Sequence, residues 1–412
     1  MSISTSDPYA MALDAIDVSN PDLYQTDSWR PWFARLRKED PVHWSENSHF
    51  GGFWSITRFE DIVTVDKSHD DFSSEPAITI GDYGNDLPVR QFIAMDPPLH
   101  DIQRKAVQGV VAPRNLADLE TIIRSRVATM LDELPIGEPF NWVDRVSVNL
   151  TTQMLATIFD FPFEDRYKLP YWSDMATSLP EIAGGDGNND ERTRALTECL
   201  ETFTALWHQR KNNPPGTMDL ISMLATNPET AAMVDDPLEY LGNLILLIVG
   251  GNDTTRNSIT GGVVALNQNP EQFSLLKANP HLVSSMVPEI IRWQTPLMHM
   301  RRIATRDVVL GGKTIRKGEK VVMWYLSGNH DETAIDDPNT FNITRDNPRY
   351  HLSFGFGIHR CMGNRLAELQ LRILWEEILA RFETIEVLAE PTRTLSSFVK
   401  GYTHLPVRVV RK

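Results

Sequence analysis

The segment that most limits the possible folds is a long apolar stretch, PLEYLGNLILLIVGGNDTTRNSITGGVVALNQ, which begins at Pro237. Proline is favoured in the first turn of a helix, and before Gly250 the side chains are apolar nearly all round the expected helix. Such a helix lies inside a large protein or in a membrane. The longest strongly apolar run, Leu244 to Val249, is too short to cross a bilayer. We therefore predict a buried central helix.

The rest of the chain indicates a mainly α protein with small β-sheets, an α+β fold. Residues 104–223 carry mainly helical patterns. PVHWSENSHFGGFWSIT predicts a hairpin, DVVLGGKTIRKGEKVVMWY predicts further strands, and the final FVKGYTHLPVRVVRK predicts paired strands. Since no repeat or linker is visible, we expect one domain over residues 1–412, with a flexible N-terminal extension over about residues 1–20.

Composition excludes several classes of function. The 412 residues include 40 Lys and Arg and 55 Asp and Glu, and the net charge of −15 argues against a nucleic-acid partner. The two cysteines, Cys199 and Cys361, form no C-x-x-C pair, which argues against disulfides and a cysteine zinc site. The N-terminus shows no signal peptide. We expect a cytoplasmic protein without a membrane span.

One glycine-rich segment interrupts the helical half of the chain. EIAGGDGNND, from Glu181 to Asp190, contains three glycines among acidic and amide residues. Fixing such a segment costs more entropy than fixing a regular turn. It is expected to be a surface loop or a moving lid over a site.

The segment HLSFGFGIHRCMG places Cys361 behind a run of small residues and just before a helical pattern, NRLAELQLRILWEEIL. A helix N-terminus stabilises a thiolate, so Cys361 is expected to be a nucleophile, with His359 as its base, or a metal ligand. An inert cysteine in a turn is the alternative. The spacing of the residues around Cys361 argues against an inert cysteine. These residues are Phe354, Gly355, Gly357 and Gly363.

The central helix contains the second candidate site, GGNDTTRN. Glycine in a helix interior costs about 1 kcal/mol relative to alanine, so Gly250 and Gly251 suggest a gap where a ligand approaches the backbone. Asp253 and Thr254 would place an acid and a hydroxyl beside that gap, and a threonine bonded to a preceding carbonyl distorts the helix. A helix-packing groove with a solvated Asp253 is the alternative.

The pattern F-G-x-G-x-H-x-C-x-G resembles the haem-binding loop of the cytochrome P-450 monooxygenases, and GGNDTT resembles their oxygen-activation motif. The resemblance implies a triangular prism of helices, with haem b between the long central helix and the helix after the cysteine. It also implies that Cys361 is the axial iron ligand and that Asp253 and Thr254 relay protons. Further haem contacts are implied for Phe354, Gly355, Gly250 and Gly363.

Three charged residues would hold the cysteine loop, from His351 to Gly363, in place. Glu289 and Arg292 in PEIIRW could be an ordinary surface pair, but they resemble the family's E-x-x-R motif, and FNITR supplies the expected third member, Arg345. The resemblance implies a buried structural network. Buried haem propionates also require charged partners, and the positions that match are His100, Arg104, Arg302 and His359.

Longer strings, such as LLIVGGNDTTRNS and IIRWQTP, are similar to a bacterial soluble subfamily that hydroxylates medium-chain alkanes and fatty acids at the terminal carbon. The resemblance implies a linear substrate: an n-alkane, a primary alcohol or a fatty acid. Gly250 replaces the alanine that is commoner in this motif. The implied substrate contacts, all apolar or small, are Leu246, Val249, Gly250, Leu297, Met298, Met300, Phe398 and Val399.

The implied partners are O2 and separate redox proteins. The nucleotide-binding pattern G-x-G-x-x-G is absent, because Arg360 stands where its third glycine would fall after Gly355 and Gly357. We see no nucleotide-binding domain or fused reductase. Electrons are therefore expected from a ferredoxin and its NAD(P)H-dependent reductase. Alternatives are another hydrophobic substrate such as a terpenoid, a peroxide-driven peroxygenase and a non-catalytic haem-thiolate sensor. The last two would not need the pair Asp253 and Thr254.

Overall fold

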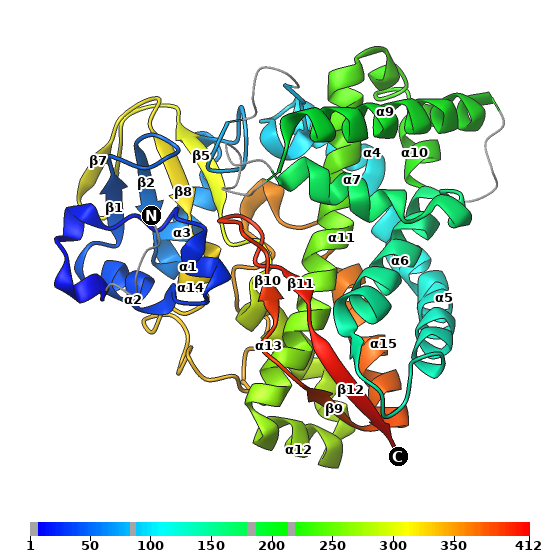
Figure 1. Cartoon of the computed structure of the whole chain (residues 1–412). Coiled ribbons are helices and arrows are strands. Elements are labelled where there is room, and N and C mark those ends of the chain that lie inside the picture. The colour runs from blue at the N-terminus through cyan, green and yellow to red at the C-terminus, as the bar shows by residue number, and fades with distance from the viewer. Residues whose placement is uncertain (1–6, 83–87, 179–186, 213–218) are drawn as a thin grey trace.

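The computed structural model describes residues 7–82, 88–178, 187–212 and 219–412, and helices dominate it (Figure 1). The long helix α11 (Pro237–Gln268) runs through the middle of the molecule, as its apolar pattern predicts. Asp236 caps it by accepting a hydrogen bond from the backbone N–H of Glu239. The predicted loop from Glu181 to Asp190 falls mostly outside the described residues.

The helical part of the molecule surrounds α11 (Figure 1). Most of these helices contact α11 directly, whereas α5 packs on α15. The surrounding helices are α4 (Leu99–Val107), α5 (Pro113–Asp132), α6 (Asn149–Phe159), α7 (Lys168–Thr177), α9 (Asn189–Asn212), α10 (Leu220–Thr226), α12 (Pro270–Ala278), α13 (Val283–Gln294) and α15 (Asn364–Arg381).

A five-stranded sheet forms the other part, on the left of Figure 1. Its order is β1 (Val42–Ser45), β2 (Phe53–Ile56), β8 (Lys320–Met323), β5 (Met300–Ala304), β3 (Phe72–Ser73). The predicted hairpin is confirmed as the antiparallel pair β1 and β2. The helices in this part are α1 (Asp22–Gln25), α2 (Arg30–Glu39), α3 (Phe59–Lys67) and α14 (Tyr325–Gly328).

The final segment forms paired strands as predicted, but its two strands do not pair with each other. β11 (Tyr402–His404) pairs with β10 (Thr392–Arg393), while β12 (Pro406–Arg411) pairs with β9 (Phe382–Val387) and β4 (Phe140–Asn141). Only Leu405 separates β11 from β12, which is too short for a hairpin loop. The remaining predicted strands, β6 (Val308–Leu310) and β7 (Lys313–Ile315), do form a hairpin.

The described part of the N-terminal extension, residues 7–20, packs against the protein. Ile16 and Val18 are buried in a cluster with Trp29, Phe33 and Trp324. A free extension would expose these apolar side chains to water, so burial holds the segment in place. None of the described helices combines the length and the apolarity needed to cross a membrane.

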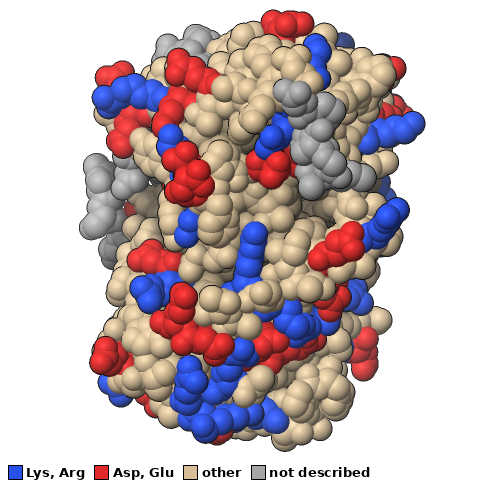
Figure 2. Space-filling view, turned by 90° about the vertical axis from the view of Figure 1, so that its right-hand side faces the viewer, with Lys and Arg blue, Asp and Glu red and all other residues tan. Residues whose placement is uncertain are grey.

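Acidic and basic side chains are intermixed on the face to the right of Figure 1 (Figure 2). Ion pairs join α5 to α15, where Arg124 contacts Glu376 at 2.6 Å and Glu377 at 2.8 Å. Pairs this exposed stabilise a fold little, because water screens them.

Candidate active site

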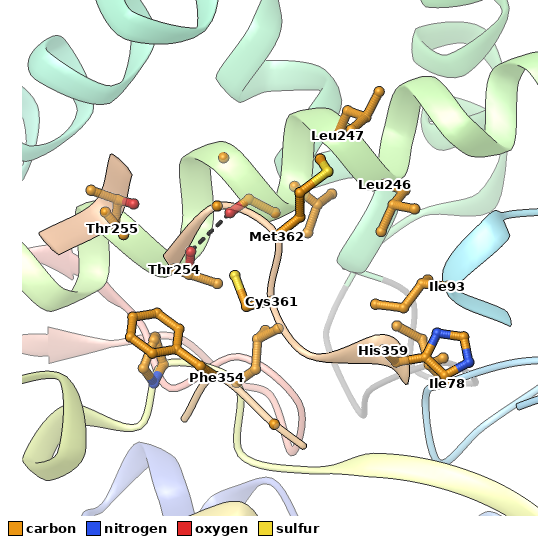
Figure 3. Close-up of a pocket in the computed structure, with 18 of the residues that line it drawn as sticks. Ile78, Ile93, Leu246, Leu247, Thr254, Thr255, Phe354, His359, Cys361 and Met362 are labelled. Atoms are coloured by element: carbon orange, nitrogen blue, oxygen red, sulfur yellow. Dashed lines mark hydrogen bonds between the residues drawn. The ribbon is translucent and has the colours of Figure 1, made fainter. Parts of the chain in front are cut away.

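A cavity of about 260 Å³ lies between α11 and the loop that precedes α15 (Figure 3). Cys361 enters it from the loop, and Thr254 and Leu246 enter it from α11. Ile78 and Ile93, from the chain before α4, close another side. The site therefore joins segments from all parts of the sequence.

The loop that carries Cys361 is shaped by glycines and by one buried acid. Gly355 and Gly357 have φ angles of 64° and 65°, where a side chain is strained, and a Cβ on Gly357 would lie 2.4 Å from the carbonyl oxygen of Asp66. The carboxylate of Asp66 accepts a hydrogen bond of 2.7 Å from the backbone N–H of Phe356. The backbone N–H of Cys361 itself bonds to the carbonyl of Phe354 at 2.8 Å.

Opposing effects act on the charge of the sulfur, and their net result is a pKa of the Cys361 thiol above its ordinary value. The accessible surface of Cys361 faces the cavity, and burial raises the pKa of the thiol. Opposing this, the backbone N–H groups of Gly363 and Asn364 and the guanidinium groups of Arg104 and Arg360 lower that pKa. α15 begins at Asn364, as predicted, so the N–H groups of its first turn point at the sulfur. This is a donor set for a thiolate that coordinates a metal.

The gap expected in the surface of α11 is present at Gly250. A Cβ on Gly250 would meet nothing within 4 Å, because this position faces the cavity, whereas a Cβ on Gly251 would lie 2.8 Å from Leu155. The hydroxyl of Thr254 donates to the carbonyl of Gly250 at 2.9 Å and lines the cavity (Figure 3). The backbone of α11 is thus open to a ligand at Gly250.

Asp253 does not lie beside that gap, contrary to the prediction. Its buried carboxylate accepts hydrogen bonds from Ser173 of α7 at 3.1 Å and from Asn252 at 3.0 Å, and it pairs with Arg256 at 3.0 Å. Successive residues of a helix point about 100° apart, so Asp253 and Thr254 face different neighbours. Burial raises the pKa of Asp253 to about 6, although Arg256 lowers it.

The three charged residues predicted to support the loop do meet. Both oxygens of Glu289 accept hydrogen bonds from Arg292, at 2.7 and 2.8 Å, and Arg345 adds a contact of 3.1 Å. Glu289 and Arg292 are fully buried. Removing one partner of such a buried ion pair strongly destabilises the protein, because the other charge is left buried without a partner.

Asn329 connects this network to the cysteine loop. The backbone carbonyl oxygen of Asn329 accepts a hydrogen bond of 2.8 Å from the guanidinium of Arg292. The side chain of Asn329 accepts from the backbone N–H of Leu352 at 2.6 Å and donates to the hydroxyl of Ser353 at 2.9 Å. The sequence showed no signal for Asn329 or for Asp66, since each acts on a partner far away along the chain.

The predicted propionate partners lie together. His100 and His359 stack edge to face with centroids 4.3 Å apart, and Arg104 and Arg302 line the same cavity as His359. Burial is the main cause that lowers the pKa of His359 to about 2. The Nε2 atom of His100 and both ring nitrogens of His359 are buried and make no hydrogen bond within the described structure. Arg302 also bonds to Asp66 at 2.8 Å.

These residues fit a haem. Orphaned imidazole nitrogens beside two guanidinium groups suit two carboxylates. A sulfur with N–H donors aimed at it suits iron. Phe354, Gly355 and Gly363 also line the cavity, and a Cβ on Gly363 would meet nothing within 4 Å.

Six of the predicted substrate contacts line the cavity, namely Leu246, Val249, Gly250, Leu297, Met300 and Phe398. Met298 and Val399 do not line it. Alternate residues of an extended chain point to opposite sides, and Met298 packs in the cluster with Trp324 instead. Val399 pairs with Leu297 through a backbone bridge. The prediction that Met298 and Val399 contact the substrate is therefore wrong, and both residues have structural roles.

Several lining residues were not predicted. Some come from a loop and a short 3-10 helix (Phe92–Ala94) before α4, and others from the first turns of α9 and α10, and none of them belongs to a motif. They include Ile78, Val89, Phe92, Ile93, Arg192 and Leu220.

Known proteins are similar to this chain over most of its length. Residues 99–400 match the family model of cytochrome P450. Linalool 8-monooxygenase of Pseudomonas putida is 35% identical over 96% of this chain and 99% of its own length. A methyl-branched lipid omega-hydroxylase of Mycobacterium bovis is 32% identical over 91% and 90%. The solved structure of cytochrome P450-153 from Novosphingobium aromaticivorans has a TM-score of 0.89 at 42% identity, covering 98% of this chain and 100% of that one. The chain belongs to the cytochrome P450 family.

Proposed function

We propose that this P450 monooxygenase hydroxylates the terminal carbon of a linear hydrophobic substrate: an n-alkane, a primary alcohol or a fatty acid. It acts in the cytoplasm as one domain, with electrons from a ferredoxin and its reductase. The observation that carries the proposal is the apolar wall of the cavity, formed by residues such as Leu246, Val249, Leu297 and Phe398 around the cysteine.

Cys361 would ligate the iron of haem b, and His100, Arg104, Arg302 and His359 would hold its propionates. When bound, a thiolate-ligated haem supplies O–O bond cleavage and the insertion of one oxygen atom into a C–H bond. The network of Glu289, Arg292 and Arg345, with Asn329, keeps the Cys361 loop in register.

Thr254 and Asp253 would deliver protons in two stages. Asp253 contacts Arg256 at 3.0 Å, and Arg256 contacts the half-exposed Asp174 at 2.5 Å, so the buried acid lies one ion pair from the surface. Because arginine keeps its protons, the proton would reach Asp253 through water beside this pair and not through Arg256 itself. A pKa near 6 lets Asp253 bind and release a proton close to neutral pH. Thr254, at the cavity wall, would pass that proton on through water.

Substrate binding would depend on the apolar chain. Each buried CH₂ contributes about 0.8 kcal/mol, so a linear chain of medium length gains affinity with each carbon. Terminal attack agrees with the name of the omega-hydroxylase relative.

The test is the position of the hydroxyl group in the products. The haem-loaded enzyme, with a ferredoxin, its reductase and NADH, is incubated with octane and with dodecanoate, and the alcohols are separated by gas chromatography. Terminal alcohols are expected. Mid-chain alcohols alone would refute terminal hydroxylation.

A terpenoid substrate is the second candidate, favoured by the 35% identity to linalool 8-monooxygenase. Titrating the enzyme with linalool and with octane, and following the Soret absorption, separates the two. Tighter binding of linalool would favour the terpenoid.

The ferredoxin is proposed to dock near the cysteine loop through five basic residues, Arg104, Lys105, Arg114, Arg360 and Arg365, of which all but the half-buried Arg104 are exposed. Electrostatic docking weakens as salt is added. The reduction rate is therefore expected to fall with ionic strength and with Arg360→Glu. A rate that responds to neither would contradict docking at this surface.

A further inference from the structure

His299 joins two segments of the cavity wall from behind. It directly precedes β5, and the residues beside it in the chain, Leu297 and Met300, line the cavity. The imidazole of His299 is fully buried, and it is not among the described side chains that line the cavity. Because no motif marks His299, its role has to be found from the groups that it contacts.

Both ring nitrogens of His299 bond to backbone groups of distant segments. The backbone N–H of Ile80 donates a hydrogen bond of 3.0 Å to Nε2, and Nδ1 donates one of 2.9 Å to the carbonyl oxygen of Ser397. An N–H group donates and a carbonyl oxygen accepts, so the proton of the neutral ring lies on Nδ1. Burial lowers the pKa of His299 to about 3, which keeps the ring neutral near pH 7.

The two segments that His299 joins carry side chains of the cavity wall. Ile78 lies two positions before Ile80, Phe398 directly follows Ser397, and both Ile78 and Phe398 line the cavity. They pack in one apolar cluster although they come from opposite ends of the chain. The ring centroid of His299 lies 5.2 Å from that of Phe398. The imidazole therefore supports this cluster on the side away from the cavity.

The chain around β5 also holds each segment through a backbone hydrogen bond. The N–H of Met298 donates to the carbonyl of Phe398 at 2.9 Å, and the N–H of Arg301 donates to the carbonyl of Ile78 at 2.8 Å. These bonds attach each segment to the chain near β5, whereas the ring of His299 links one segment directly to the other. A rigid ring with one donor and one acceptor therefore sets the distance between the segments.

We propose that His299 is a positioning residue for the hydroxylation, because it holds Ile78 and Phe398 at a fixed distance and so selects the carbon of the substrate that reacts. This inference rests on the proposed hydroxylation of a hydrophobic substrate, but it applies whichever carbon the wild type favours. An alkane has no polar group, so only the shape of the wall can hold its register. A misplacement of about 1 Å can lower a rate about 100-fold, so a small displacement of Phe398 should change the products.

The test removes the hydrogen bonds of His299 one at a time. In His299→Gln the amide reaches the place of Nε2 and can accept from Ile80, and in His299→Asn it reaches the place of Nδ1 and can donate to Ser397. His299→Phe keeps a ring and loses both bonds. The products from octane and from linalool are separated by gas chromatography. The ratio of the favoured alcohol to the other alcohols should fall about threefold or more in His299→Phe, and less in the two amide variants.

Two further measurements separate positioning from stability. The dissociation constants of octane and linalool, measured by the Soret shift, should change less than about twofold in the His299 variants, because the lining side chains are the same. The control is His43→Phe in β1. His43 is also buried, and its nitrogens bond to Asp40 at 2.9 Å and to the carbonyl of Ile16 at 3.0 Å, but it is not among the described lining residues. This variant should lower the thermal midpoint and leave the ratio of alcohols unchanged.

An unchanged ratio in haem-loaded His299→Phe would overturn the proposal. A loss of haem from all three His299 variants, or an equal change of the ratio in His43→Phe, would overturn it as well, because either result would give His299 a structural role alone. Terminal hydroxylation is judged from the wild type by itself. Mid-chain octanols from the wild type, combined with a ratio that depends on His299, would refute terminal attack and leave the positioning role standing.

Discussion

The hydroxyl of Thr254 donates a hydrogen bond of 2.9 Å to the carbonyl oxygen of Gly250, one turn earlier in α11. Both residues line the cavity that Cys361 enters. The bond fixes the hydroxyl at the wall where substrate and oxygen would meet, and it leaves the hydroxyl able to accept a hydrogen bond from water.

Replacing Thr254 by Ala should separate oxygen consumption from product formation. The fold should survive, because only one hydroxyl and one methyl group are lost. General acid catalysis contributes about 10²-fold or more, so the yield of alcohol per NADH should fall about tenfold or more while peroxide accumulates. Thr254→Ser keeps the hydroxyl and should retain most of the yield. An unchanged yield in Thr254→Ala would rule out the proton-relay role.

Asp253 should make stability depend on pH. Burial raises its pKa from 3.8 to about 6, so between these values the folded state holds a proton that the unfolded state releases. The stabilisation from this proton is complete below pH 3.8 and is lost as the pH rises through about 6. Relative to Asp253→Asn, the wild type should lose about 1 to 2 kcal/mol of unfolding free energy between pH 5 and pH 7. Urea unfolding curves measure this difference, and parallel pH profiles would contradict it.

Glu289→Gln should destabilise the protein and loosen the cysteine loop. It leaves Arg292 buried beside a neutral amide, and breaking a buried ion pair costs about 3 to 5 kcal/mol. Haem content per chain and unfolding free energy should fall together. The control is Glu368→Gln, which breaks the exposed pair with Arg349 and should cost about 1 kcal/mol or less. Equal effects of the two variants would show that the Glu289 network gives no special support.

The two adjacent glycines of α11 should respond oppositely to alanine. Gly250→Ala adds a methyl group into open space and should stabilise the helix by up to about 1 kcal/mol, while narrowing the cavity. Gly251→Ala would place its methyl 2.8 Å from Leu155 and should destabilise the protein. Thermal midpoints measure both variants. A lower midpoint for Gly250→Ala would contradict an open cavity at that position.

Features encoded within a short segment could be predicted from the sequence. The length of α11, the β1–β2 hairpin and the start of α15 behind Cys361 follow from local apolar period, turn residues and glycines. Residues 7–20 escaped prediction because the burial of Ile16 and Val18 depends on distant partners.

The parts of the site that depend on side-chain direction or on distant contacts could not be predicted. Asp253 and Met298 were placed in the right segments, but the residues around them, Ser173 and Trp324, decide which way they point. Arg192 belongs to no motif, and only the packing of α9 on α11 brings it to the cavity.

The central claim is that the Cys361 thiolate coordinates haem iron. The most direct measurement is the absorption spectrum of the purified, reduced protein under carbon monoxide, for the wild type and for Cys361→Ala. A strongly red-shifted Soret band in the wild type that disappears in Cys361→Ala is the predicted result. A protein without a Soret band, or a red-shifted band that persists in Cys361→Ala, would contradict it.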